Sequence, residues 1–143
     1  MVTPAGLCFE DLSLGQSAAR SWTVTLANIE AFAAVSGDTN PVHMDEASAA
    51  ASPFKGRVAH GMLAASHISA VLGMQLPGPG AIYLSQTLRF LRPVRPGDQL
   101  DVTVTVTDLD PAKAHATLST VGKVGRKAVV DGVAVVLVSR RSA

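Results

Sequence analysis

The feature that most constrains the fold is a long apolar segment near the middle of the chain. From His60 to Met74, leucine, isoleucine, valine, methionine and alanine occupy nearly every face of a helix, with a few small polar residues and histidines among them. A helix that is apolar on all sides belongs in the interior of a domain. Its histidines, serines and glycines make it a poor lipid-facing segment. We therefore predict a buried central helix, ended by Pro77, and no membrane span.

The segments around this helix have the periodicity of strands and short helices. The clearest pattern runs from Leu100 to Thr107, where leucine or valine alternates with aspartate or threonine, as in a half-buried antiparallel strand. Further strands are predicted over Gln16–Leu26, Ala81–Phe90, Ala114–Val121 and Ala128–Val138, with a hairpin across Gly122–Gly125. Short helices are predicted over Leu26–Val35, capped by Thr25 and ended by Gly37, and over Asp45–Ala51.

A buried helix with one strand before it and four after it requires an antiparallel sheet that curls around it. We therefore predict an α+β domain. The 143 residues are the length of one ordinary domain, so we expect a single domain over residues 1–143. An open sheet has edge strands, and pairing of one edge with the same strand of a second copy would cover it. The expected assembly is a homodimer.

Composition excludes several classes of partner. Twelve basic and 11 acidic residues give a net charge of +1, which lacks the positive excess of a protein that binds nucleic acid through phosphates. The single cysteine, Cys8, cannot form an internal disulfide and suits a reducing compartment. The first residues do not have the pattern of a secretory signal. We expect a cytoplasmic protein that binds neither nucleic acid nor membranes.

A carboxylate and an imidazole lie close together in the segment from Ser36 to His43. Pro41 restricts Asn40 to an extended conformation, and the Asn40 side chain can bond to nearby backbone groups, so the loop could hold Asp38 and His43 rigidly. If both reach one water molecule, they can share proton abstraction and donation. Taken alone, composition and spacing favour an ordinary turn that ends a helix, with His43 on the surface.

The central helix offers two more candidate residues. Gly61 lies at its start, where the first N–H groups could face a developing negative charge, although a glycine there could simply permit close packing. Ser69 lies about two turns further along the same face, where a serine can bond to its own helix. His60 and His67 are seven residues apart without a nearby cysteine or carboxylate. We interpret both histidines as structural and predict no metal site.

The segment from Phe32 to His43, continued to Ala49, resembles the signature of the R-specific enoyl-CoA hydratases, or hydratase 2, in the MaoC-like group. It has the aromatic residue, the small aliphatic residue, Ser-Gly-Asp, Asn-Pro-aliphatic-His, five spacers and a small residue. The likeness continues through His60–Leu63 and Tyr83–Gln86 and covers most of the chain. The resemblance implies a hot-dog fold, in which a curved antiparallel sheet wraps a long helix, usually in a homodimer.

The resemblance also implies an activity, the reversible syn addition of water to a trans-2-enoyl-CoA to give an (R)-3-hydroxyacyl-CoA. No metal or redox cofactor is implied, and the partner is the acyl-CoA thioester. By their positions in the motif, Asp38 and His43 would activate the water, and the Gly61 N–H would stabilise the thioester enolate. Asn40 and Ser69 would contact the substrate. Cations available for the phosphates of coenzyme A are Lys55, Arg57, Arg89, Arg92 and Arg95.

Three alternatives remain open from the sequence. The first is a dehydratase acting on 3-hydroxyacyl chains attached to a carrier protein, the second a thioesterase of the same fold, and the third a non-catalytic acyl-CoA-binding protein. The spacing of Asp38, Asn40 and His43 favours hydration over thioester hydrolysis, and the intact pair argues against a role in binding alone.

Overall fold

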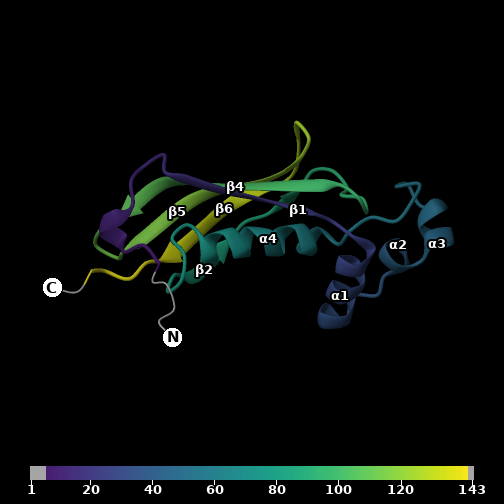
Figure 1. The fold of residues 1–143 in the computed structure, drawn as a ribbon, viewed down its shortest axis with the longest axis horizontal. Helices are drawn as coiled ribbons and strands as arrows, with labels where there is room; N and C mark the ends of the chain where they lie inside the picture. Colours follow the sequence, from purple (N-terminus) through teal and green to yellow (C-terminus); the bar gives the residue numbers. More distant parts are fainter. Residues whose placement is uncertain (1–5, 142–143) are drawn as a thin grey trace.

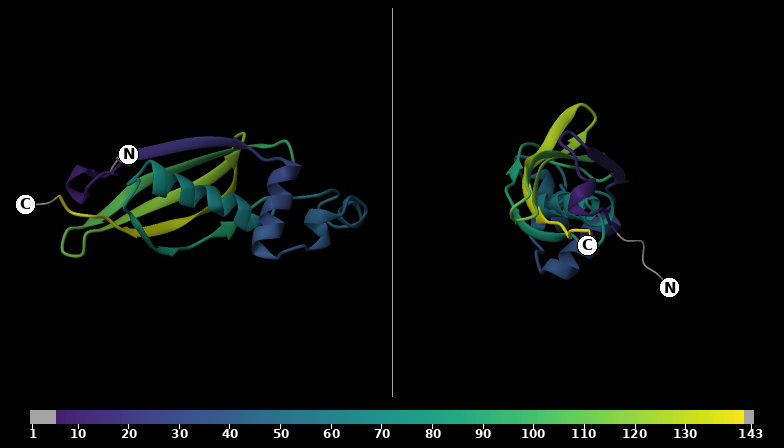
Figure 2. Two further views of the ribbon diagram at one scale, coloured as in Figure 1. Left: turned by 60° about the horizontal axis from the view of Figure 1, so that its bottom comes forward. Right: turned by 90° about the vertical axis from the view of Figure 1, so that its left-hand side faces the viewer.

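A curved antiparallel sheet surrounds one long helix (Figures 1 and 2). The computed structural model describes residues 6–141, and within them the sheet has six strands in the order β1-β4-β5-β6-β2, with β3 also paired to β6. The elements in chain order are η1 (Phe9–Asp11), β1 (Ser17–Thr23), α1 (Leu26–Ser36), α2 (Pro41–Met44), α3 (Glu46–Ala50), α4 (Gly61–Met74), β2 (Ile82–Gln86), β3 (Arg89–Phe90), β4 (Gln99–Asp110), β5 (His115–Val124) and β6 (Lys127–Leu137). This confirms the predicted α+β arrangement.

Helix α4 is the centre of the core. Its residues Ile68 and Val71 are fully buried in the same hydrophobic cluster as Val102 and Val104 of β4. Burying a side chain of this size contributes about 1.5–3 kcal/mol. The alternating residues of β4 point their apolar side toward the helix, as the sequence pattern predicts. Within the described range 6–141, none of the helices is long and apolar enough to cross a bilayer.

One stripe of α4 is not covered by the sheet. Met62, Ser66 and Ser69 are exposed, and Met62 retains 54% of its accessible surface. The prediction that the helix is buried on every side is therefore wrong for this face. These positions follow helical spacing, so they form one line along α4 on the side toward β2.

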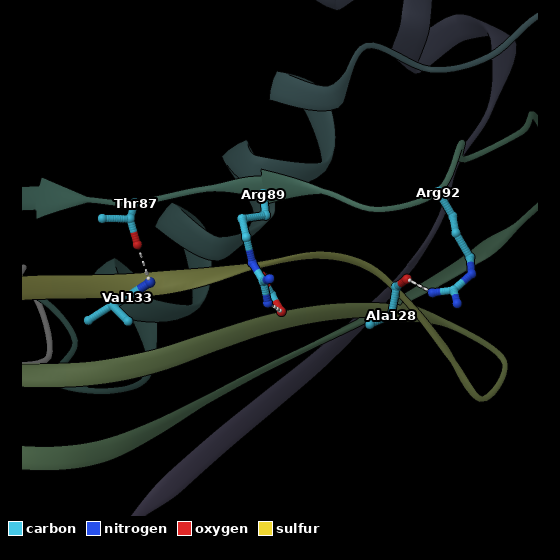
Figure 3. A network of polar contacts seen from close by, with 6 residues as sticks. Thr87, Arg89, Arg92, Ala128 and Val133 are labelled. Atoms are coloured by element: carbon cyan, nitrogen blue, oxygen red, sulfur yellow. Dashed lines mark hydrogen bonds and ion pairs between the residues drawn. The ribbon is translucent and has the colours of Figure 1, made fainter.

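The predicted strand over Ala81–Phe90 is divided into β2 and β3. Gln86 lies opposite Ala134 and Arg89 opposite Asp131, so the register is the same on both sides of the break. Between them, the Thr87 hydroxyl accepts a hydrogen bond from the Val133 N–H at 2.9 Å, taking over a role that a backbone carbonyl has in a regular ladder (Figure 3). The Arg89–Asp131 ion pair at 2.8 Å then fixes β3 to β6.

Gly132 allows the chain to interrupt the ladder at Thr87. A Cβ atom at position 132 would lie 1.7 Å from the Thr87 carbonyl oxygen, closer than any side chain can approach. The strand therefore breaks because of a contact across the sheet, which periodicity within Ala81–Phe90 does not reveal.

The short helices begin and end as local rules predict, with one addition. The Thr25 hydroxyl accepts the Asn28 N–H at 3.1 Å at the start of α1, and Gly37 ends the helix with a φ of 79°. Helix α2 was not predicted. It begins at Pro41, a residue suited to the first helical turn. In Figure 1, α1, α2 and α3 gather at the end of the sheet where α4 begins.

The turn between β5 and β6 is shorter than predicted. The two strands remain paired to Val124 and Lys127, which leaves Gly125 and Arg126 as the connection instead of Gly122–Gly125. Gly125 has a φ of 62°, the conformation that a tight two-residue hairpin requires.

An aromatic stack connects the edge strand β1 to α4. The Trp22 ring lies 4.2 Å from the His67 ring with an angle of 24° between them, and the Arg20 guanidinium lies over Trp22 at 5.0 Å. Burial, and secondarily the positive charge of Arg20, lower the pKa of His67 below its ordinary value of 6.5.

This stack predicts that stability falls on acidification. Because folding disfavours charged His67, its contribution is complete above the ordinary pKa of 6.5 and is lost as pH falls from there toward the lower folded-state pKa. Urea unfolding at about pH 7.5 and about pH 5.5 should show a smaller loss of unfolding free energy in His67→Phe than in the native protein. An equally large loss in both would contradict the assignment to His67.

The contact at Gly132 predicts a strong local effect of a single methyl group. Gly132→Ala should lower the free energy of unfolding by about 1–3 kcal/mol, because β6 and Thr87 must move apart. Urea unfolding measures this. Gly73→Ala is the matched control, since a Cβ there meets no atom within 4 Å and alanine favours the helix. A Gly132→Ala protein as stable as the control would refute this account.

Candidate active site

The loop between α1 and α2 holds Asp38 through local hydrogen bonds. The Asp38 N–H donates to the Ser36 hydroxyl at 3.1 Å, and the Asp38 carboxylate accepts the Asn40 N–H at 3.2 Å. Such a turn, formed by a side chain and nearby backbone groups, restricts a loop without burying it. Residues 34–41 are all exposed, so the carboxylate is accessible to water.

His43 lies in α2 with its tautomer fixed by the backbone. Its Nδ1 is 2.7 Å from the Val58 carbonyl oxygen. Because a carbonyl can only accept, Nδ1 carries the proton, and the Nε2 of the neutral ring retains its lone pair. The half-buried His43 can therefore accept a proton through Nε2 without losing the bond that orients it.

His60 lies against both candidate residues. Its ring is 2% exposed and stacks on the His43 ring at 4.0 Å, and its Nε2 donates to the Asp38 carbonyl at 2.9 Å. One donor atom from each of Asp38, His43 and His60 lies within 4.8 Å of the other two. The sequence-based interpretation of His60 as structural missed this juxtaposition. Its place directly before Gly61, at the start of the buried helix, was the available signal.

The same three side chains are poorly arranged for a metal ion. The two imidazoles are stacked 4.0 Å apart with 30° between their planes, so their in-plane lone pairs lie in two nearly parallel planes. A bound metal requires donor atoms that converge on one point. The cluster is better suited to proton transfer than to chelation.

Asp38, His43 and Gly61 line one pocket of about 360 Å³. Two larger hollows adjoin it. One, of about 420 Å³, shares His43 and Gly61 and is otherwise mostly apolar, with Arg92 on its wall. The other, of about 490 Å³, includes Ser69. Three predicted residues thus share one pocket, and Ser69 lies in the neighbouring one.

Gly61 begins α4 at the wall of this pocket. Its N–H is among the first groups of the helix, which have no acceptor within the helix itself. A Cβ atom here would lie 2.7 Å from the Phe90 ring of β3. The glycine therefore allows Phe90 to pack against the helix start, while Gly61 itself stays exposed and lines the pocket.

Asn40 contributes to the site through the backbone. Its side-chain oxygen accepts the Val42 N–H at 3.3 Å and thereby caps α2, the helix that carries His43. A contact between Asn40 and a substrate stays a prediction.

The fold and the site agree with a known family. Residues 13–133 match the model of the MaoC like domain. The chain belongs to the MaoC-like family. A curated relative, the (R)-specific enoyl-CoA hydratase of Rhodospirillum rubrum, is 51% identical over 133 residues, covering 93% of this chain and 92% of that protein. The 3-hydroxybutyryl-CoA dehydratase of Methylorubrum extorquens is 45% identical, over 94% of this chain and 86% of that protein.

A solved structure places the MaoC-like chain in the hot-dog fold. The unliganded R-hydratase PhaJ1 from Pseudomonas aeruginosa superposes with a TM-score of 0.90 at 44% identity, over 95% of this chain and 88% of that one. The hot-dog fold expected from the sequence is therefore confirmed. The sheet is curved but not closed into a barrel.

The cations near the MaoC-like site differ in what they contact. The Arg57 Nε donates to the His43 carbonyl at 2.7 Å, and Arg95 donates to the Phe54 carbonyl at 2.5 Å. Arg89 is paired with Asp131, and Arg92 donates to the Ala128 carbonyl at 2.6 Å (Figure 3). Arg92 is the one of these arginines that also lines the pocket beside His43. Arg57 instead helps to hold α2 in place.

Proposed function

We propose that this protein is a hydro-lyase that reversibly hydrates trans-2-enoyl-CoA to (R)-3-hydroxyacyl-CoA. The observation that carries the proposal is the Asp38 carboxylate beside a His43 ring whose Nε2 is free to accept a proton, in a pocket that reaches the start of α4. The stereochemistry and the thioester are supported by the names of the relatives from Rhodospirillum rubrum and Methylorubrum extorquens.

The chemistry requires the pair to bind one water molecule. As the water oxygen attacks C3, electrons move from the double bond to the thioester oxygen, which becomes an enolate. The proton that the water loses is held by Asp38 and His43 and then delivered to C2 on the same face, so hydroxyl and hydrogen add in syn fashion. The Gly61 N–H stabilises the enolate, a contact whose loss typically costs about 2.7–4 kcal/mol. Dehydration follows the same steps in reverse, without a metal or redox cofactor.

The two adjoining hollows suit the two arms of the thioester. The hollow with Ser69 is lined mainly by apolar side chains such as Phe32 and Leu88 and would receive the acyl chain. The hollow with Arg92 would receive the coenzyme A arm, because a guanidinium matches phosphate geometry. A reducing compartment suits the single Cys8, and we place the enzyme in the cytoplasm.

Replacing either member of the pair should remove most of the activity. Asp38→Asn or His43→Ala should lower kcat for crotonyl-CoA hydration by about two to four orders of magnitude, with the fold intact. Loss of the conjugated-enoyl absorbance measures the rate, and chiral analysis of the product tests the R configuration. Asp108→Asn, an exposed change outside the site, is the matched control. Near-native activity in either site variant would refute the assignment.

The same assay separates the alternatives. Faster turnover of a carrier-linked crotonyl thioester than of crotonyl-CoA would identify a carrier-protein dehydratase. Release of free thiol without a 3-hydroxyacyl product would identify a thioesterase. Equal, negligible rates for the native protein and Asp38→Asn would leave a binding function.

We also propose that the enzyme is a homodimer joined along β2. This strand lies at an edge of the sheet and exposes Ile82, Tyr83 and Leu84, beside the uncovered Met62 of α4. An apolar edge strand is a surface that proteins usually cover. A second copy would extend the sheet and shield this stripe.

The dimer predicts a mass of about twice the 14.7 kDa of the chain by light scattering. Leu84→Lys should halve that mass, because it places a charge on the contact surface. Leu14→Lys is the control, since Leu14 is 67% exposed and lies before β1, outside β2. A monomeric native protein at micromolar concentration would overturn the proposal.

A further inference from the structure

We propose that His60 is a positioning residue that fixes Asp38 and His43 relative to each other. The role rests on the proposed hydration activity, since it acts through the pair that performs it. His60 does not need to touch the substrate. Its single imidazole bonds to the Asp38 backbone and stacks on the His43 ring.

The two contacts of His60 are of different kinds. Its Nε2–H donates to the Asp38 carbonyl at 2.9 Å, which holds the exposed loop at its base. Its face packs against the His43 ring at 4.0 Å, which limits the tilt of the proposed base. Each contact alone would restrain one residue. Together they set the distance between the Asp38 backbone and the His43 imidazole.

His60 can do this because its own position is set by the core. It is the residue at the N-terminal boundary of α4, and its ring also packs against Phe32 of α1 at 4.9 Å. The helix behind it is fixed by buried residues such as Leu63 and Ile68. The His60 side chain therefore restrains the exposed loop at residues 34–41, because the core holds His60 itself in place.

Arg57 and Val58, which lie just before His60 in the sequence, bond to α2 and not to the loop that carries Asp38. The Arg57 Nε donates to the His43 carbonyl at 2.7 Å, and the Val58 N–H donates to the Val42 carbonyl at 3.3 Å. The Val58 carbonyl in turn accepts the His43 Nδ1–H. These bonds all reach α2. Within this short segment, His60 is the residue whose side chain bonds to the Asp38 side of the loop.

A residue at position 60 that only filled space in the core would not need a polar ring. Within residues 6–141, the buried Nδ1 of His60 has no hydrogen-bond partner. Burying an unpaired polar atom is unfavourable, and a phenylalanine would fill the same place without it. Histidine provides an Nε2–H donor that phenylalanine lacks. The hydrogen bond to the Asp38 carbonyl is therefore the feature that requires a histidine at this position.

Two substitutions separate the donor from the ring. His60→Phe keeps an aromatic ring against His43 and removes the donor, whereas His60→Gln keeps an N–H that can reach the Asp38 carbonyl and removes the ring. We expect kcat for crotonyl-CoA to fall about 100-fold in His60→Phe, with KM changed less than about threefold, as for a misplaced catalytic group. His60→Gln should retain at least about five times the kcat of His60→Phe. If His60 only fills space, His60→Phe should instead retain a higher kcat than His60→Gln.

The control is His67→Phe, the same substitution in α4 at a histidine that contacts Trp22 instead of the loop. It should leave kcat within about twofold of the native value. In a His43→Ala background, His60→Phe should reduce the remaining activity far less than 100-fold, because Asp38 then has no imidazole partner to be held against. An equal loss in both backgrounds would overturn the proposal.

The failure of this inference is distinguishable from that of the proposed function. An active native enzyme whose His60→Phe variant keeps more than about a third of kcat overturns only the positioning role. A native protein inactive on all enoyl thioesters overturns the function itself. If neither variant folds, long-range ¹H–¹⁵N spectra of the native protein decide: the Nε2–H tautomer of His60 supports the bond to Asp38, and the Nδ1–H tautomer overturns it.

Discussion

The burial of α4 under a curved sheet is the interaction on which the rest of the structure depends. The apolar faces of β4, β5 and β6 pack in one hydrophobic cluster with α4, where residues such as Ile68 and Leu118 are fully buried. A helix held in this way along its length has a fixed first turn. Gly61 and His60, which line the pocket together with Asp38 and His43, lie at that turn.

The site combines the fixed first turn of α4 with the exposed loop that carries Asp38. Asp38 lies in a loop open to water, and His43 is half-buried with its tautomer set by Val58. Water, the proposed reactant, must reach the pair, so complete burial would be counterproductive. The fold combines access with order because His60 bonds the open loop to the start of the buried helix, while the backbone of Val58 holds the neighbouring α2.

The sequence predicts those parts of the molecule that depend on neighbours along the chain. The caps at Thr25 and Gly37 follow from local hydrogen bonding, and the motif around Asp38 is contiguous. Helix α2 was missed because Asn40-Pro41 suits an extended turn as well as a helix start. The break after β2 and the stacking of His60 on His43 depend on residues far apart in sequence, so no periodicity reports them. The uncovered stripe of α4 was missed because hydropathy does not distinguish burial within one chain from an exposed apolar face.

Met62 borders all three hollows: the one with Asp38, the one with Arg92 and the one with Ser69. Methionine is an unbranched, flexible side chain, so Met62 can move between the hollow proposed for the acyl chain and the hollow proposed for coenzyme A. A different residue at this position would widen, narrow or divide the channel without altering the carboxylate, the imidazole or the helix start. Selectivity and reactivity are thereby separable in this architecture, and relatives can diverge in the molecules they accept while the reacting groups stay unchanged.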